Sequence, residues 1–464
     1  MSRVPFLALS FLVLVAGCAD PEVPSGKVYF LNSEGSALLQ GVSTVLVDRV
    51  SPDGKTTKVF KGTSLPESID MGKSGNYRFR LTGSDENGLP VLGGETFSQE
   101  VSGLLGVKIP MLLARRDRLV AAPERLNFAP GATPQVGIYG GSALWVWSMK
   151  AAEQIETDGY SFAYWQQVTP ALSDSDADLK LQNIDCPTAS CEWKNLIIVG
   201  GFYAIAIADG WASLIDTVLG TQDAFAAPAT LSSFADVAGG TVLPAANSGA
   251  VLIGGTRLTS PTASVLSVDQ NLSPTVISLS TPRAGAAALF EAGPGLVIAG
   301  GSSTGPGVER LGPGESTFTA LAYPPDPVVG AALVMTDATH LLRVGGRNPD
   351  GTAAATAQLD LSCAPGLCAL VPMPNLNLDL YAARSFYDEL TSDSIIVGEI
   401  ATGETVLYRY ASQSQTIVPI AVPESQRRIH ATPVELPVRE VALVGGTLPD
   451  NAATSRSVIS VVSF

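Results

Sequence analysis

Four of the five cysteines fall into two closely spaced pairs. These pairs are Cys186 with Cys191 and Cys363 with Cys368, each separated by four residues that include a proline. Four cysteines permit three pairings, but such short loops favour a local disulfide within each pair, as expected in an oxidising compartment. A zinc site built from four thiolates is the alternative, although the pairs lie far apart in the chain. Loops this small gain less than the ~3 kcal/mol of a 15-residue closure, so the bridges would stiffen their loops only locally.

A short run of aspartates has the spacing of a calcium-binding loop. Asp174, Asp176 and Asp178 alternate along the chain, and Asp185 follows eleven residues after the first. Alternating carboxylates at such positions supply the oxygen ligands that Ca²⁺ prefers. However, Leu179 occupies the sixth position, where the sharp turn of such a loop needs glycine, and an aspartate stands where a bidentate glutamate is usual. A solvated acidic loop therefore remains the alternative, and calcium is the one cofactor that the sequence suggests.

The tryptophans are concentrated in one part of the chain. All five lie between residues 145 and 211, and tyrosines are interspersed among them. Exposed aromatic faces would form a platform for sugar rings or for a partner protein. The alternative is that these side chains pack between strands. The candidate platform residues are Trp145, Trp147, Tyr164, Trp165, Tyr203 and Trp211.

Composition restricts the class of protein. The chain has 464 residues, enough for two or three domains, and carries a formal charge of −15. A nucleic-acid binder needs a basic face, so this charge argues against one. Hydrophobic residues make up 46% of the chain and charged residues only 15%, which argues against disorder. The 46 glycines and 32 prolines separate short aliphatic runs, which indicates many strands and turns.

The N-terminus has the features of an export signal. Arg3 precedes an apolar run from Val4 to Val15, which is too short to span the ~30 Å of a bilayer as a helix. The run ends in Val15-Ala-Gly-Cys18, which resembles the bacterial lipobox, and an ordinary signal peptide with a chance cysteine is the alternative. The resemblance implies that 1–17 is a signal peptide and that a lipid on Cys18 anchors the protein in the membrane through a tether at 18–26. Ala19 implies export to the outer membrane.

A small β-sandwich is expected over residues 27–113. The clearest strand is Asn76–Leu81, where Tyr77, Phe79 and Leu81 alternate with two arginines. The segment resembles Ig-like or transthyretin-like modules of bacterial surface proteins, which implies a spacer or stalk.

A repeated pattern occupies the rest of the chain. An apolar strand ends at a glycine, usually a glycine pair, with a mean spacing of about 51 residues, close to the ~50 of kelch repeats. Prolines interleave with these sites and are predicted to end outer strands, because proline lacks the N–H that a sheet requires. The first glycines lie at 140, 200, 254, 300, 345, 398 and 445, and the prolines at 123, 170, 228, 282, 324, 374 and 423.

The pattern resembles the kelch β-propeller. Pro282-Arg283-Ala284 and Arg428-Ile429-His430 match the start of kelch blades, although most copies lack the usual tyrosine and tryptophan. The resemblance implies an all-β fold with a propeller over 114–464. We predict seven blades, with six as the alternative. We also predict that Arg118–Pro123 pairs with the C-terminal strand Ser457–Phe464 and so closes the ring.

Known propeller chemistries find little support in the residues. Galactose-oxidase-like enzymes hold copper with two histidines and two tyrosines, one of which is thioether-linked to a cysteine. Here His340 and His430 are the only histidines, and each cysteine of the two pairs has a local partner. No nucleophile elbow and no sialidase signature occurs. We therefore expect non-catalytic binding of a protein or glycan at the cell envelope, with no nucleic acid bound. The alternatives are a polysaccharide-acting enzyme that uses carboxylates in the propeller funnel and a structural envelope component.

Overall fold

The computed structural model describes the chain from residue 25 to residue 464, with gaps. Between residues 122 and 192 it describes only the backbone of the strands. The segments outside the description are 1–24, 32–33, 73, 97, 102–107, 126–132, 141–142, 150–159, 167–179, 185–192, 201–202, 217–220, 246–248, 255, 258–259, 365, 437 and 456–457.

The described regular structure is almost entirely strand, which confirms the predicted all-β fold. The helical segments described are 3-10 turns of three to five residues, namely η1 (Gly35–Leu39), η4 (Phe234–Asp236), η6 (Pro374–Leu376) and η7 (Glu424–Gln426). In the described part of the chain, no helix combines the length and the apolar character needed to cross a membrane.

Two sheets form the N-terminal part of the molecule. β5 alternates as predicted, with Phe79 and Leu81 buried and Tyr77 partly buried against the same core. β9 joins this sheet, so its pairing continues two residues past the expected boundary at 113. One sheet has the order β4 (Ile69–Asp70), β1 (Ser25–Leu31) and β8 (Lys108–Leu112), and the other the order β3 (Thr56–Gly62), β2 (Thr44–Val50), β5 (Asn76–Ser84), β6 (Pro90–Glu95) and β9 (Ala114–Arg115), with β7 (Gln99–Glu100) beside β5.

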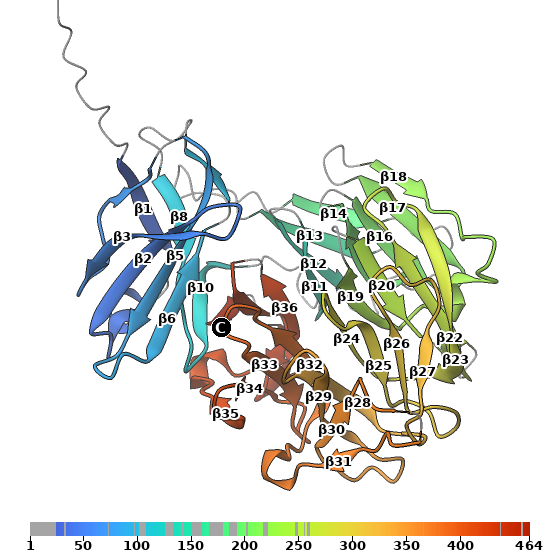
Figure 1. Ribbon diagram of the computed structural model, residues 1–464. Helices are drawn as coiled ribbons and strands as arrows, with labels where there is room; N and C mark the ends of the chain where they lie inside the picture. The colour runs from blue at the N-terminus through green and yellow to red at the C-terminus, as the bar shows by residue number, and fades with distance from the viewer. Residues whose placement is uncertain are drawn as a thin grey trace, which may run out of the picture.

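From residue 133 onward, antiparallel sheets follow one another in chain order (Figure 1). The first two comprise β11 (Thr133–Gly140), β12 (Ala143–Met149), β13 (Tyr160–Gln166) and β14 (Lys180–Ile184), and β15 (Trp193–Val199), β16 (Tyr203–Ala208), β17 (Trp211–Asp216) and β18 (Thr221–Ala224). The third comprises β19 (Thr241–Ala245), β20 (Gly249–Ile253), β22 (Ser260–Val268) and β23 (Pro274–Arg283), with β21 (Thr256–Arg257) also paired to β22.

The later sheets repeat this arrangement of four strands. They comprise β24 (Ala287–Glu291), β25 (Gly295–Ala299), β26 (Val308–Leu311) and β27 (Thr319–Leu321); β28 (Val329–Met335), β29 (His340–Arg347), β30 (Ala357–Asp360) and β31 (Val371–Pro372); and β32 (Tyr381–Tyr387), β33 (Ser394–Glu399), β34 (Thr405–Ala411) and β35 (Thr416–Ile420). The last holds β36 (Thr432–Leu436), β37 (Glu440–Val444) and β40 (Val458–Ser463), and β38 (Thr447–Leu448) and β39 (Asn451–Ser455) form a separate hairpin.

The two ends of this series of sheets are joined by strand pairing. β10 (Val120–Arg125) comes from the N-terminal side of the series and pairs antiparallel with β40, with Val120 opposite Val461. The predicted closure is confirmed, because a strand from residues near 120 completes the last sheet. Small sheets in sequence, closed by strands from both ends, form a β-propeller. This closure also removes an exposed sheet edge.

The hydrophobic core lies between successive sheets. Along β20, Ala250 and Leu252 pack with the preceding sheet, whereas Val251 and Ile253 pack with the following one. Side chains of a strand alternate between its two faces, so an apolar run without polar interruptions can serve two interfaces at once. This explains why the sequence shows continuous aliphatic bursts instead of an alternating pattern.

The glycine sites occupy two different places in the sheets. The five sites from Gly254 to Gly445 lie at the end of the second strand of their sheets, whereas Gly140 and Gly200 lie at the end of the first strand. The expectation of equivalent positions is therefore met only from the third sheet onward. A glycine pair suits any tight connection between antiparallel strands, so the pair by itself does not reveal which connection it makes. Of the seven prolines predicted to end outer strands, Pro170 is outside the description, and the other six lie in or shortly after outer strands.

Two arginines that the sequence pattern singled out hold the glycine turns in place. Arg283 donates from Nη1 to the carbonyl of Gly300 at 2.6 Å, and Arg428 donates from Nη1 to the carbonyl of Gly445 at 3.3 Å. Each arginine lies 17 residues before the glycine it binds. Both side chains are buried, so their repeated position reflects a structural role and not a binding role.

Candidate functional site

Three glutamates gather at the inner ends of three sheets. Glu291 ends β24, Glu389 follows β32 by two residues, and Glu435 lies in β36, so all three stand where the first strand turns back into the second. First strands of neighbouring sheets contact one another, as β24 does β28 and β28 does β32, and therefore line the centre of the ring. The three carboxylates consequently converge from separate sheets.

The pKa values of two of these carboxylates report their mutual proximity. Burial raises the pKa of Glu291 to about 8, and the negative charges of Glu435 and Glu389 add to the effect. Burial likewise raises the pKa of Glu435 to about 7, with further contributions from Asp388 and Glu389. Both groups therefore titrate near neutral pH, where ordinary glutamates are fully ionised.

The carboxylates are accessible despite this desolvation. Glu389 and Glu435 are exposed, and Glu291 is partly exposed. Within the described residues, no hydrogen bond or ion pair is made by any of the three side chains. Carboxylates that are open to solvent and lack a protein partner can receive a cation from outside, or can exchange a proton with a bound molecule.

A single cation lies farther along the same central strand. Arg384 is exposed on β32, and among the described residues it has no hydrogen-bond or ion-pair partner. Burial alone lowers the pKa of its guanidinium. It is five residues from Glu389, about 16 Å along a strand, so it does not neutralise the carboxylate group directly.

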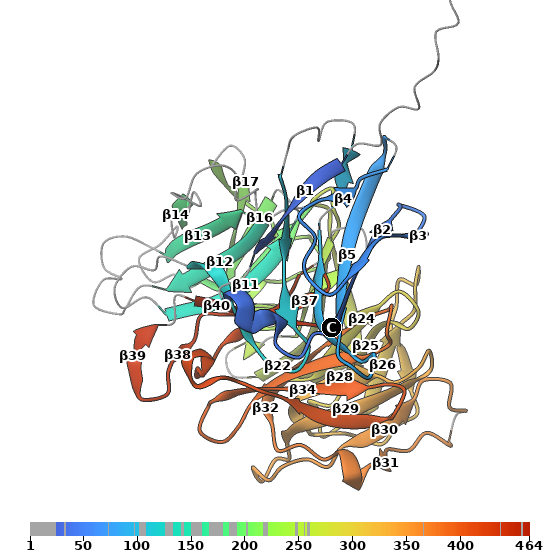
Figure 2. The same cartoon turned by 90° about the vertical axis from the view of Figure 1, so that its left-hand side faces the viewer.

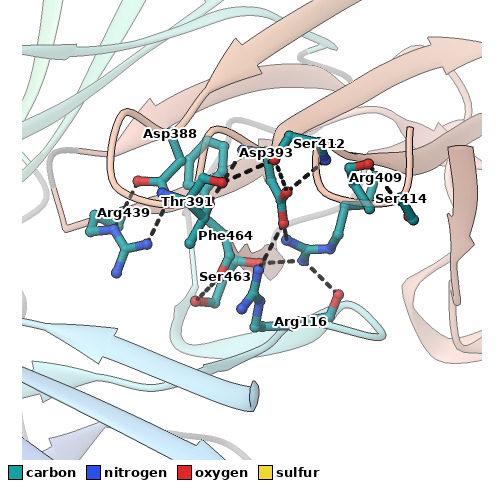
Figure 3. A network of polar contacts seen from close by, with 11 residues as sticks. Arg116, Asp388, Thr391, Asp393, Arg409, Ser412, Ser414, Arg439, Ser463 and Phe464 are labelled. Atoms are coloured by element: carbon teal, nitrogen blue, oxygen red, sulfur yellow. Dashed lines mark hydrogen bonds and ion pairs between the residues drawn. The ribbon is translucent and has the colours of Figure 1, made fainter. Parts of the chain in front are cut away.

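A polar network holds the hairpin that carries Glu389 (Figure 3). Asp388 accepts hydrogen bonds from Arg439 Nε at 2.9 Å and Nη2 at 2.6 Å, and also from Thr391. The same arginine lies in the turn between β36 and β37, next to the strand of Glu435. The Arg439 guanidinium and the hydroxyl of Thr391 hold the pKa of Asp388 below its ordinary value against the effect of burial. The two hairpins that present Glu389 and Glu435 are therefore tied together.

The network continues to Arg116, which follows β9, and to the C-terminal end of the chain. Arg116 donates to Asp393 Oδ2 at 3.1 Å, and Arg409 Nη2 donates to the carbonyls of Arg116 and Ser463, each at 2.8 Å. Burial, and then the charge of Arg116, lowers the pKa of Arg409 to about 10. Figure 3 shows these side chains meeting around Phe464, which is itself buried. These contacts hold the hairpin between β32 and β33 from a second side.

The structure separates two members of the predicted aromatic platform. Tyr203 begins β16 and pairs with Asp216, whereas Trp211 begins β17 and pairs with Ala208, so the two aromatics stand at opposite ends of one hairpin. Trp211 is 48% exposed, and Tyr203 is partly buried. Trp193, in the same tryptophan-rich segment, is fully buried in the core.

The other platform residues are placed by backbone register alone. Trp145 on β12 stands opposite Tyr164 on β13, and Trp165 stands opposite Leu144. Trp147 is also on β12. The description of these strands does not extend to their side chains, so the platform remains a prediction here.

The disulfide between Cys363 and Cys368 is present, as the sequence predicted. Among the described residues, no group of three His, Cys, Asp or Glu side chains is arranged so that it could hold a metal ion. Several other predicted residues lie outside the description. Those outside are Cys18, Cys186, Cys191, Asp174, Asp176, Asp178 and Asp185.

The two histidines each contact a different carboxylate. His340 Nδ1 lies 2.9 Å from Asp337, and His430 Nδ1 lies 3.0 Å from Glu399. Neither carboxylate belongs to the central group. The structure gives these histidines separate surface partners instead of a shared one.

Sequence reasoning missed the glutamate group, although a signal for it exists. Glu291 and Glu389 are 98 residues apart, about two repeats, and Glu389 and Glu435 are 46 apart, about one repeat. Recurrence at the repeat length places residues at equivalent positions of different sheets. The signal is weak, because the glycines and prolines recur in every repeat whereas the glutamate does not: Thr336 stands 45 residues after Glu291 in the intervening sheet.

No family model and no curated protein matches this chain. Among solved structures, the streptogramin B lyase structure is 12% identical, covers 73% of this chain and 96% of its own, and has a TM-score of 0.40. The β-propeller domain of the trilobed protease from Pyrococcus furiosus is 10% identical, covers 72% and 94%, and has a TM-score of 0.42. A mitotic checkpoint complex structure is 10% identical, covers 75% and 95%, and has a TM-score of 0.40. These likenesses concern the fold and carry no information on ligand or activity.

Proposed function

We propose that this chain is a lipid-anchored protein of the bacterial cell envelope whose propeller binds a protein or glycan partner without catalysis. The export signal and the lipobox-like Cys18 support the outer-membrane location. The observation that carries the binding role is the solvent-accessible group of Glu291, Glu389 and Glu435, which lacks partners among the described residues. Such a group fits a ligand that presents a cationic moiety.

The finer architecture belongs to the same proposal. Counted by their first strands, the sheets that begin with β11, β15, β19, β24, β28, β32 and β36 correspond to seven kelch-like blades. The strands from β1 to β9 correspond to an Ig-like or transthyretin-like module. The arginines that bind the glycine turns support the kelch comparison, because they recur at the same distance from their glycines.

The net charge of the chain agrees with a cationic ligand. A formal charge of −15 attracts cations to the surface, and the three neighbouring carboxylates add a local concentration of negative charge. The amino groups of a lysine-rich protein segment or of an amino sugar have the required chemistry. Both belong to the protein or glycan partners expected from the sequence.

A second function is favoured by one specific observation. Glu291 and Glu435 have pKa values near neutrality, and a general acid works best when its pKa lies near the working pH. Two carboxyl groups flanking a glycosidic bond, one protonated and one ionised, are the usual catalytic groups of glycoside hydrolysis. In a polysaccharide-acting enzyme, Glu291 would donate the proton and Glu435 would act as base or nucleophile.

The two functions can be separated by experiment. Wild-type protein and an E291Q/E435Q variant are applied to a glycan array and used in pull-downs from envelope extracts, and release of reducing ends from polysaccharides is measured in parallel. The matched control is E67Q, which changes an exposed glutamate in the connection between β3 and β4.

Binding that is lost in E291Q/E435Q and kept in E67Q supports the binding role. Release of reducing ends by the wild type, abolished in the double variant, supports the enzyme instead. Absence of any ligand, or equal binding by all three proteins, contradicts the proposed function.

A further inference from the structure

The N-terminal sheets are packed against the last sheet of the propeller. One hydrophobic cluster contains Phe79, Leu81 and Leu92 from the N-terminal sheets together with Val120 and Val461 from the closing pair of strands. Both views show the C-terminal end of the chain next to the N-terminal strands (Figure 1, Figure 2). The contact is close, because a Cβ added at Gly93 of β6 would lie 2.1 Å from Ser463 Oγ of β40. This contact covers the seam where the ring closes.

A carboxyl group without partners is buried at this seam. Glu440 is 0% exposed, begins β37 and pairs with Ser463, the residue that touches Gly93. Neither of its carboxyl oxygens has a hydrogen-bond partner among the described residues. An ionised carboxylate in such a place would be strongly unfavourable, because it would lose its hydration without compensation.

A carboxylate of the N-terminal sheets makes ionisation of Glu440 still less favourable. Glu95 of β6 is 1% exposed and is held by Arg78 at 2.7 Å and Arg80 at 2.6 Å. These arginines are already paired with Glu95, so neither is directed at a second carboxylate. On the other sides, Arg439 pairs with Asp388 and Arg115 pairs with Asp117. Burial and the negative charge of Glu95 accordingly raise the pKa of Glu440 well above 4.5.

We propose that the docking of the N-terminal sheets onto the closing sheet is a proton-dependent lock, in which Glu440 must keep its proton for the seam to stay covered. Loss of the proton places a second negative charge beside Glu95 inside the interface. Undocking relieves this repulsion by admitting water. The lock tightens in acid and loosens as the pH rises.

The direction in which docking changes with pH follows from proton linkage. In the undocked state Glu440 has an ordinary pKa near 4.5, whereas in the docked state it keeps its proton to higher pH. Between these two pKa values the docked state holds one proton more, so docking weakens by up to about tenfold for each unit of rising pH. Below pH 4.5 the group is protonated in both states and makes no difference.

Hydrogen exchange of the full chain tests the lock. The exchange rates of β40 amides, Val458–Ser463, are measured at several pH values in the wild type and in E440Q, whose amide cannot ionise. At each pH the ratio of the two rates removes the intrinsic pH dependence of exchange. We expect the wild-type rate to increase relative to E440Q from about pH 5 upward, by as much as tenfold per unit. Amides of β25, in a distant sheet, serve as the control and should show a constant ratio.

A second variant keeps the proposal testable if E440Q folds poorly. In E95Q the neighbouring charge is absent, so the docked-state pKa of Glu440 falls, and the rise in β40 exchange should begin at the same pH but level off at a lower pH than in the wild type. A β40 ratio that stays constant from pH 5 to pH 8 in E440Q overturns the proposal. An unchanged pH profile in E95Q overturns the role given to Glu95. The central carboxylates take no part in this readout, so failure here leaves the proposed binding function untouched.

Discussion

Replacement of Arg283 by methionine tests whether buried arginines hold the sheets together. Arg283 is 1% exposed and Glu309 is 0% exposed, and Arg283 Nη2 donates to Glu309 Oε1 at 2.9 Å. The guanidinium also donates to the carbonyls of Gly300, Pro306 and Gly307. R283M would leave Glu309 as a buried charge whose remaining donor is the backbone N–H of Ser280. Breaking such a buried pair costs about 3–5 kcal/mol of unfolding free energy.

Urea unfolding monitored by circular dichroism measures this cost. The matched control is K194M, because Lys194 and Asp209 form a pair at 2.6 Å that is 32% and 52% exposed. An exposed pair contributes about 0–1 kcal/mol, so K194M should leave the unfolding free energy almost unchanged. The R283M/E309Q double variant should lose less than the sum of the single variants, because the unpaired charge is gone. A loss below about 1 kcal/mol in R283M would refute the reasoning.

Three further outcomes are expected. Val120→Asp places a charge in a fully buried position of the closing strand, so the ring should open. Solution scattering should show a larger radius of gyration, and the unfolding free energy should fall by several kcal/mol. The C363S/C368S variant should lose less than ~3 kcal/mol in urea unfolding and keep the compact shape, because its loop is short and local. Binding of a lysine-rich peptide should strengthen as pH rises from 6 to 8, by up to about tenfold through ionisation of Glu435, whose pKa is about 7, and E435Q should flatten this dependence in calorimetry.

The closure of the ring was predictable because it follows from counting strands. The sequence offers an unpaired strand near Val120 and a last sheet that lacks an outer strand, and strand edges in soluble proteins tend to be covered. The positions of Gly140 and Gly200 were not predictable in the same way. A glycine permits a tight turn wherever one occurs, so its presence fixes that a turn exists and leaves the identity of the connected strands open.

The candidate site was harder to predict, because its residues are ordinary in sequence. Glu291, Glu389 and Glu435 belong to no motif, and their unusual pKa values arise from burial and from one another. Both effects depend on bringing three sheets together. The aromatic residues predicted a ligand platform by their type, but Trp193 shows that a large aromatic side chain in this segment can be buried entirely in the core.

Glu435 and Glu440 show why a raised pKa does not by itself identify a binding site. They lie on the two sides of one hairpin, and burial raises the pKa of both. Glu435 keeps contact with solvent, so a ligand can reach it, whereas Glu440 is sealed beneath the N-terminal sheets. E435Q should therefore alter ligand binding and leave β40 exchange unchanged, and E440Q should do the reverse. If either variant altered both properties, the central carboxylates and the seam would be a single coupled unit, and their separate assignment would be wrong.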